Sequence, residues 1–146
     1  MRILALDVGD RRIGVAISDE LNISAHSLMT LDRRDQRKEA EQIIELIKDY
    51  NVEEVVVGMP VMMDGSVGIQ AEKVSKFVDE LKKVIDIPIN YFDERLSTKL
   101  IEKTLIDADL SRGKRRKIID KLSAVIILQD YMSSRANTPE GGVEDI

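Results

Sequence analysis

The chain has no cysteine and no tryptophan, and His26 is its single histidine. The absence of cysteine excludes disulfides and thiolate metal sites, and one histidine offers little support for a zinc site or a Ser-His-Asp triad. Aromatic residues make up only 3% of the chain, which argues against a surface that binds single strands by stacking their bases. Chemistry based on carboxylates remains compatible with all of these absences.

The sequence also lacks a long apolar run. The opening MRILALDVG meets charged residues at once, so it is neither a signal peptide nor a membrane span. We therefore expect a cytoplasmic protein that has no membrane partner. A length of 146 residues suits one domain, which we place at residues 1–134. Residues 135–146 contain one proline and two glycines without an apolar pattern, and we expect them to form a loose C-terminal tail.

Acidic residues outnumber basic residues by 27 to 22, and the net charge of −5 argues mildly against a nucleic-acid-binding protein. The distribution of charge matters more than its sum, however, and two basic clusters stand out. The first comprises Arg33, Arg34, Arg37 and Lys38, and the second is the stretch RGKRRK at 112–117. Each cluster fits either a local nucleic-acid surface or a solvated loop and helix end. The second cluster fits the nucleic-acid surface better than the first does.

The segment 3–19 contains two short apolar runs, 3–6 and 13–17, which are joined by the polar stretch DVGDRR. This pattern predicts an antiparallel hairpin of two buried strands. Asp7 directly follows four apolar residues, so we expect it at the end of a core strand. A buried charge there costs several kcal/mol unless a partner compensates it, and a bound cation, Arg11 or Arg12 would do so. Gly9 allows the backbone to turn where a side chain would crowd a ligand.

Three interpretations of Asp7 compete at this point. It is a metal ligand of a site that cuts phosphodiesters, part of a phosphate-binding hairpin like that of sugar kinases, actin and chaperone ATPases, or a cap of the turn through backbone amides. The hairpin segment alone does not decide among them. Nucleotide binding of the ATPase kind uses two such subdomains, and this chain has the length for only one, so that interpretation is less favoured.

The remaining apolar patterns predict the order of the elements along the chain. Further strands are expected at 26–31, 54–58 and 88–92, and helices at about 36–50, 69–84, 98–108 and 115–134. Residues 109–114 are expected to form a loop that contains Gly113. An antiparallel meander followed by alternating helices and strands predicts an α/β fold with a five-stranded mixed sheet and helices on both faces. The expected strand order, 3-2-1-4-5, resembles the ribonuclease H arrangement.

Acidic residues lie at the ends of two predicted strands and within the last predicted helix. Asp7 ends the first strand, Asp93 and Glu94 end the fifth, and Asp120 lies in the apolar last helix. Each acid also has an interpretation without a functional role. The acids that end the fifth strand could form an ion pair with a basic neighbour, and Asp120 could lie on the exposed side of its helix. If the three acids converge, their mutual repulsion favours a divalent cation such as Mg²⁺, which prefers oxygen ligands. Two such ions can activate a water and hold the leaving oxygen of a phosphodiester.

Four stretches of the chain together resemble the YqgF/RuvX family, relatives of the RuvC Holliday-junction resolvases with a ribonuclease H-like fold. They are LALDVGDRRIGVAISD, VVVGMPVMMDGSVGIQAEKV, FDERLST and KIIDKLSAVIILQDY, and they lie in this order between residue 3 and about residue 132. The resemblance implies a nuclease that matures the 5′ end of precursor 16S rRNA, and junction resolution is the other activity associated with the family.

By motif, the resemblance assigns the catalytic and metal-binding roles to Asp7, Glu94 and Asp120, with one or two Mg²⁺ or Mn²⁺ ions. The residues expected to line the same site are Gly9, Gly58, Pro60, Asp64, Gly65, Asp93 and Arg95. The residues expected to hold phosphates, on charge and position, are Arg11, Arg12, Lys114, Arg115 and Arg116.

We therefore predict a metal-dependent endonuclease that acts on nucleic acid, with precursor rRNA and ribosomal particles as its expected partners. Two alternatives stay open: a resolvase of four-way DNA junctions, and an RNA-binding assembly or transcription factor that does not cut. A resolvase cuts two strands symmetrically and needs a dimer. The sequence shows no clear dimer helix, so monomer and homodimer both stay open.

Overall fold

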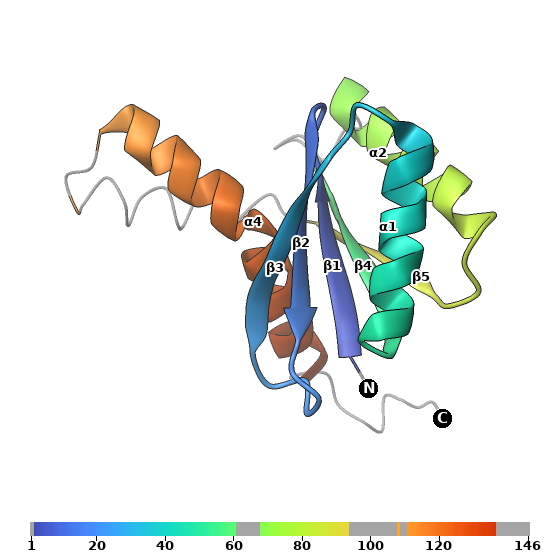
Figure 1. Ribbon diagram of the computed structural model, residues 1–146. Coiled ribbons are helices and arrows are strands. Elements are labelled where there is room, and N and C mark those ends of the chain that lie inside the picture. The colour runs from blue at the N-terminus through green and yellow to red at the C-terminus, as the bar shows by residue number, and fades with distance from the viewer. Residues whose placement is uncertain (1, 61–67, 94–107, 109–110, 137–146) are drawn as a thin grey trace.

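A five-stranded mixed sheet forms the centre of the computed structural model (Figure 1), in the order β3-β2-β1-β4-β5. The structure describes residues 2–60, 68–93, 108 and 111–136, with the backbone alone at 36–37, 115–121 and 136. β1 (Arg2–Val8), β2 (Arg12–Ser18) and β3 (Ala25–Asp32) form the antiparallel meander. β4 (Val52–Met59) and β5 (Ile89–Asp93) run parallel to β1. The predicted fold class and strand order are confirmed.

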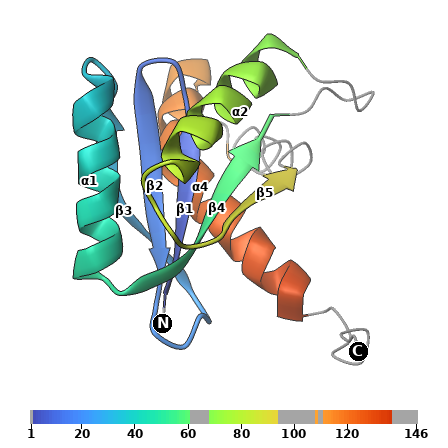
Figure 2. The same cartoon turned by 90° about the vertical axis from the view of Figure 1, so that its right-hand side faces the viewer.

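Helices cover both faces of the sheet, as Figures 1 and 2 show. α1 (Gln36–Asp49) and α2 (Ile69–Lys82) lie on one face, and α4 (Arg112–Ala136) lies on the other. Strand residues alternate between the two faces. Leu4 and Leu6 of β1 therefore belong to the core beneath α1 and α2, whereas Ile3 and Ala5 belong to the core beneath α4.

The last helix begins at Arg112, so the prediction that 109–114 form a loop and that the helix starts at residue 115 is wrong for residues 112–114. Gly113 favoured a loop in the sequence, but Ser111 precedes the helix and its hydroxyl oxygen accepts a hydrogen bond from the amide of Lys114 at 3.3 Å. This contact satisfies one of the amides that a helix start leaves without a partner. The basic stretch 112–117 is consequently the beginning of a helix.

The other end of α4 also differs from the prediction. The helix runs to Ala136, so residues 135 and 136 belong to it and not to the expected tail. Among the described side chains of this helix, Ala124, Ile127, Leu128 and Met132 are buried. The predicted helix 98–108, apart from residue 108, and the remaining tail 137–146 lie outside the described residues. None of the helices that the structure describes is long and apolar enough to cross a membrane.

The C-terminal half of α4 is fastened to the sheet around the carboxylate of Glu54, whose side chain is 15% exposed. The Tyr131 hydroxyl donates to this carboxylate, Asn90 donates to it at 2.6 Å, and Arg135 donates to it at 2.5 Å. The ring of Tyr131 also makes an edge contact with Phe92, with the ring centroids 6.1 Å apart. Burial raises the pKa of Tyr131, and its hydrogen bond to Glu54 raises it further.

This shift predicts how stability depends on alkaline pH. The folded protein holds the Tyr131 proton more tightly than the unfolded chain does, so the contribution is complete below the usual tyrosine pKa of 10.0 and is lost as pH rises through the raised value. We expect the free energy of unfolding to fall more steeply above about pH 10 in the wild type than in Tyr131→Phe. Urea unfolding at a series of alkaline pH values measures this difference. Tyr91→Phe removes a hydroxyl from a tyrosine that is 40% exposed, and this control should keep the wild-type slope.

Candidate metal and nucleic-acid site

Asp7 lies in β1, one residue before the strand ends at Val8, and it is half-buried. Strand alternation places it on the same face as Ile3 and Ala5, which is the face that α4 covers. Its direct partner in the β1–β2 ladder is Gly14. Side chains that are directly opposite share one face of an antiparallel pair, and Gly14 has no side chain there. No side chain of β2 therefore stands directly opposite the Asp7 carboxylate on this face.

The other two predicted acids come from elements near this face. β5 ends at Asp93, immediately before Glu94 in the chain, and Glu94 itself lies outside the described residues. Asp120 lies in α4, which packs across β1, β2 and β3, but its side chain is also outside the described part. Within the described residues there is no group of three or more His, Cys, Asp or Glu side chains that could hold a metal. The structure thus brings together Asp7 and the helix that carries Asp120.

The described members of the predicted lining, Gly9, Gly58, Pro60 and Asp93, lie where three parallel strands end. Gly58 is buried in β4 and is the register partner of Phe92, and the next pair along is Met59 with Asp93. The carboxyl ends of β1, β4 and β5 meet at one edge of the sheet, which is where open α/β sheets bind their ligands. Pro60 directly follows β4 at this edge, and Gly9 directly follows β1. The remaining predicted lining residues, Asp64, Gly65 and Arg95, lie outside the described residues.

The predicted phosphate-binding residues divide into two groups. Arg11 and Arg12 are exposed at the turn between β1 and β2, and Lys114 is exposed in the first turn of α4. Arg12 stands opposite Asp32 in the β2–β3 ladder. The pKa of Asp32 is lowered chiefly by a hydrogen bond from the Arg34 amide, and the charges of Arg34 and Arg12 lower it further. The side chains of Arg115 and Arg116, which follow Lys114 in α4, lie outside the part of the chain that the structure describes.

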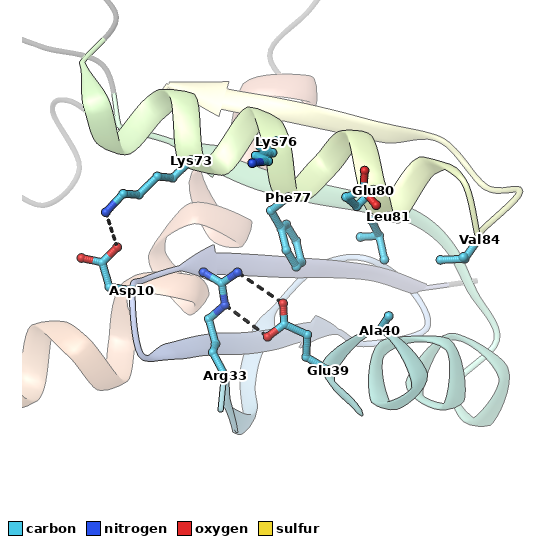
Figure 3. Close-up of a pocket in the computed structure, with 10 residues that line it drawn as sticks. All are labelled: Asp10, Arg33, Glu39, Ala40, Lys73, Lys76, Phe77, Glu80, Leu81 and Val84. Atoms are coloured by element: carbon cyan, nitrogen blue, oxygen red, sulfur yellow. Dashed lines mark hydrogen bonds and ion pairs between the residues drawn. The ribbon is translucent and has the colours of Figure 1, made fainter. Parts of the chain in front are cut away.

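The sequence analysis did not predict the ion pair of Arg33 with Glu39, which lies on the face of the sheet that α1 and α2 cover, opposite to Asp7. Arg33 belonged to the first basic cluster, but its side chain is only 16% exposed and makes an ion pair with Glu39, which is 4% exposed (Figure 3). It is therefore not a solvated loop residue. Arg33 lies in a loop and Glu39 lies in the first turn of α1. The periodicity of a helix or a strand does not predict a contact between two such residues. No signal in the sequence could have revealed this pair.

The fold is similar to that of solved resolvases. Thermus thermophilus RuvC superimposes with a TM-score of 0.52 at 12% sequence identity, covering 94% of this chain and 98% of that chain. T. thermophilus RuvC in complex with its Holliday junction substrate superimposes with the same TM-score, 0.52, at 15% identity. The fold is that of the RuvC-like proteins of the ribonuclease H class.

The family can be stated more closely. Residues 1–134 match the family model described as "RuvX: Holliday junction resolvase", and the chain belongs to this family. A relative from Desulforamulus reducens is 51% identical over 136 residues, covering 93% of this chain and 99% of the relative. A relative from Caldanaerobacter subterraneus subsp. tengcongensis is 50% identical over 139 residues, covering 94% and 100%. Both relatives are named "Putative pre-16S rRNA nuclease".

Proposed function

We propose that the chain is a metal-dependent endonuclease that hydrolyses a phosphodiester bond of precursor 16S rRNA to mature its 5′ end. The observation that carries the proposal is the half-buried Asp7 carboxylate beside Gly14, on the face that α4 covers in a RuvX fold. The names of the relatives support precursor rRNA as the substrate class. The match of residues 1–134 to the family model supports a single nuclease domain over that range, and a cytoplasmic location would place it with precursor rRNA and ribosomal particles.

The donor chemistry of the site fits a hard divalent cation. Carboxylate oxygen is the ligand that Mg²⁺ and Mn²⁺ prefer, and the β-strand partner of Asp7, Gly14, places no side chain beside its carboxylate. In the proposed site Asp7, Glu94 and Asp120 hold one or two such ions. When bound, the metal supplies an activated water and stabilises charge on the phosphate. The protein's own contribution is to hold the acids on rigid elements and to orient the RNA backbone through its basic residues.

The helical position of the second basic cluster leads to a prediction about RNA binding. Replacing Lys114, Arg115 and Arg116 together by alanine should weaken binding to precursor RNA at fixed salt. If each residue neutralises one phosphate of a single-stranded region, the slope of log affinity against log salt should become shallower by about 2. Filter binding over a range of salt concentrations measures both quantities.

A matched control removes the same charge from the opposite end of the sheet. Lys48 lies in the last turn of α1, Lys82 lies in the last turn of α2, and Lys83 follows it, all of them exposed. Replacing these three lysines by alanine should leave the salt slope at its wild-type value. An equal loss of affinity in both triple variants would show that net charge, and not the start of α4, determines binding.

Resolution of four-way DNA junctions is the second candidate function, favoured by the description of the family model and by the RuvC-like fold. The two candidates differ in substrate, so wild-type protein should be incubated with precursor 16S RNA and with a four-way DNA junction in parallel, with Mg²⁺ or Mn²⁺. The proposed function predicts cleavage of the RNA. Cleavage of the junction alone would establish the resolvase instead.

A further inference from the structure

The turn that follows Asp7, residues 8–12, is closed by a hydrogen bond from the Gly9 amide to the carbonyl of Arg12 at 2.9 Å. A side chain at Gly9 would bring its Cβ to 3.0 Å from that same carbonyl oxygen, so the turn leaves no space there. The carbonyl of Gly9 accepts a hydrogen bond from Nη1 of Arg33 at 2.7 Å. The backbone two residues beyond Asp7 is therefore attached to a guanidinium group.

That guanidinium is itself held in a single orientation. Its Nε and Nη2 donate to the two carboxylate oxygens of Glu39 at 3.2 and 3.3 Å, and its charge lies over the ring of Phe77, 5.4 Å from the centroid (Figure 3). The backbone amide of Arg33 also donates to the carbonyl of Arg11 at 3.0 Å. Arg33 thus connects the turn to α1 through Glu39 and to α2 through Phe77. The planar guanidinium has donors on two edges and can bond Glu39 and the Gly9 carbonyl at the same time, which an ammonium group cannot do.

The other described side-chain contacts of the turn are weaker. Lys73 pairs with Asp10 at 3.2 Å, but these side chains are 55% and 65% exposed, and exposed ion pairs contribute little. Gln70 donates to the carbonyl of Val8 at 3.3 Å, which is a long bond between neutral groups. The bonds of Arg33 are short or paired with a buried charge, so they dominate.

A cavity of about 530 Å³ lies between α1 and α2, on the face of the sheet opposite to Asp7, and Arg33, Phe77 and Asp10 are among the residues that line it (Figure 3).

We infer that Arg33 is a positioning residue, which holds the turn behind Asp7 through the Gly9 carbonyl and so fixes the Asp7 carboxylate for the metal. The inference rests on the proposed function, in which Asp7 binds that metal. Groups that hydrogen-bond a metal ligand directly change metal affinity by roughly 10–100-fold when they are mutated. Arg33 acts on Asp7 through two residues of backbone, so we expect an effect at the lower end of this range.

Arg33→Lys tests the inference because lysine keeps the positive charge beside Glu39 but lacks the planar guanidinium, which donates to Glu39 and to Gly9 at the same time. We expect Mn²⁺ affinity, measured by calorimetric titration, to fall about 10-fold or more. In the metal-free protein, hydrogen exchange of the Gly9 amide should become faster, while exchange of Leu4, in the middle of the same strand, should not change. RNA affinity without metal should stay at the wild-type value.

Arg2→Lys is a control of matched chemistry at the other end of β1. Arg2 also donates to a backbone carbonyl, that of Tyr50 at 3.2 Å, lies over the Tyr50 ring at 5.8 Å, and pairs with Glu20 at 3.4 Å. This variant should keep the wild-type Mn²⁺ affinity and the wild-type exchange of Gly9.

Three results would overturn the inference, and they are distinguishable. Wild-type Mn²⁺ affinity in Arg33→Lys, with the wild type binding Mn²⁺ normally, would reject the positioning role and leave the proposed function intact. An equal loss of Mn²⁺ affinity in Arg33→Lys and Arg2→Lys would show that the loss comes from a general decrease in stability and not from the position of Asp7. A wild-type protein that binds no Mn²⁺ would reject the proposed metal site and the inference together.

Discussion

Replacing Asp7 by asparagine is expected to slow RNA cleavage by at least about 10³-fold, because a catalytic metal supplies several kcal/mol of transition-state stabilisation. Asparagine has nearly the same shape as aspartate but no charge, so the half-buried position in β1 should tolerate it. RNA affinity should stay the same or increase, because removing a negative charge reduces repulsion of the phosphates. Single-turnover cleavage and filter binding on the same protein preparation measure the two effects separately.

Asp10→Asn is the matched control for this experiment. Asp10 lies on the same turn, but its side chain is 65% exposed and pairs with the exposed Lys73. The same chemical change there should alter cleavage by no more than about 3-fold, the effect of a weak surface ion pair. Comparable loss of activity in both variants, or none in Asp7→Asn, would contradict the assignment of Asp7.

Arg33→Met is expected to destabilise the protein by about 3–5 kcal/mol, because it leaves the Glu39 carboxylate buried without its charged partner. Glu39 is only 4% exposed, so water cannot easily replace the two hydrogen bonds from the guanidinium. The lost contact with the Phe77 ring adds to the effect. Urea unfolding should show a lower midpoint with an unchanged slope.

The double variant Arg33→Met with Glu39→Leu separates the unpaired charge from the loss of packing. Replacing both members of a buried ion pair by apolar residues is often close to neutral, so the double variant should be more stable than Arg33→Met alone. Stability losses that simply add would mean that the two side chains do not interact energetically, against the geometry of the pair.

Local patterns in the sequence predicted most of the sheet. The runs 3–6 and 13–17 are short, apolar and separated by a polar turn, and buried strands with such a link pair only as a hairpin. The position of Asp7 followed from the four apolar residues before it, since an uninterrupted buried run ends where the first charge appears. The register placed Asp7 inside β1 instead of at its last residue, because Val8 still pairs with Ile13.

Contacts between distant elements were harder to predict. Gly113 favoured a loop, but the Ser111 cap outweighs one glycine, whose cost in a helix is about 1 kcal/mol. In the sequence Arg33 was only one member of a basic cluster that fitted either a nucleic-acid surface or a solvated loop, because its burial comes from Glu39 in α1 and Phe77 in α2. Side chains of two different helices create this environment, and neither helix carries a sign of it alone.

The most direct test of the metal-dependent nuclease is mapping of the 5′ ends of precursor 16S RNA after incubation with the protein. Wild type with Mg²⁺ or Mn²⁺ should generate the mature 5′ end, while wild type with a chelator and Asp7→Asn with metal should generate none. Cleavage that continues in the chelator, or in Asp7→Asn, would contradict a metal site at Asp7. Uncut RNA that wild type and Asp7→Asn bind equally well would identify an RNA-binding factor on a nuclease fold instead.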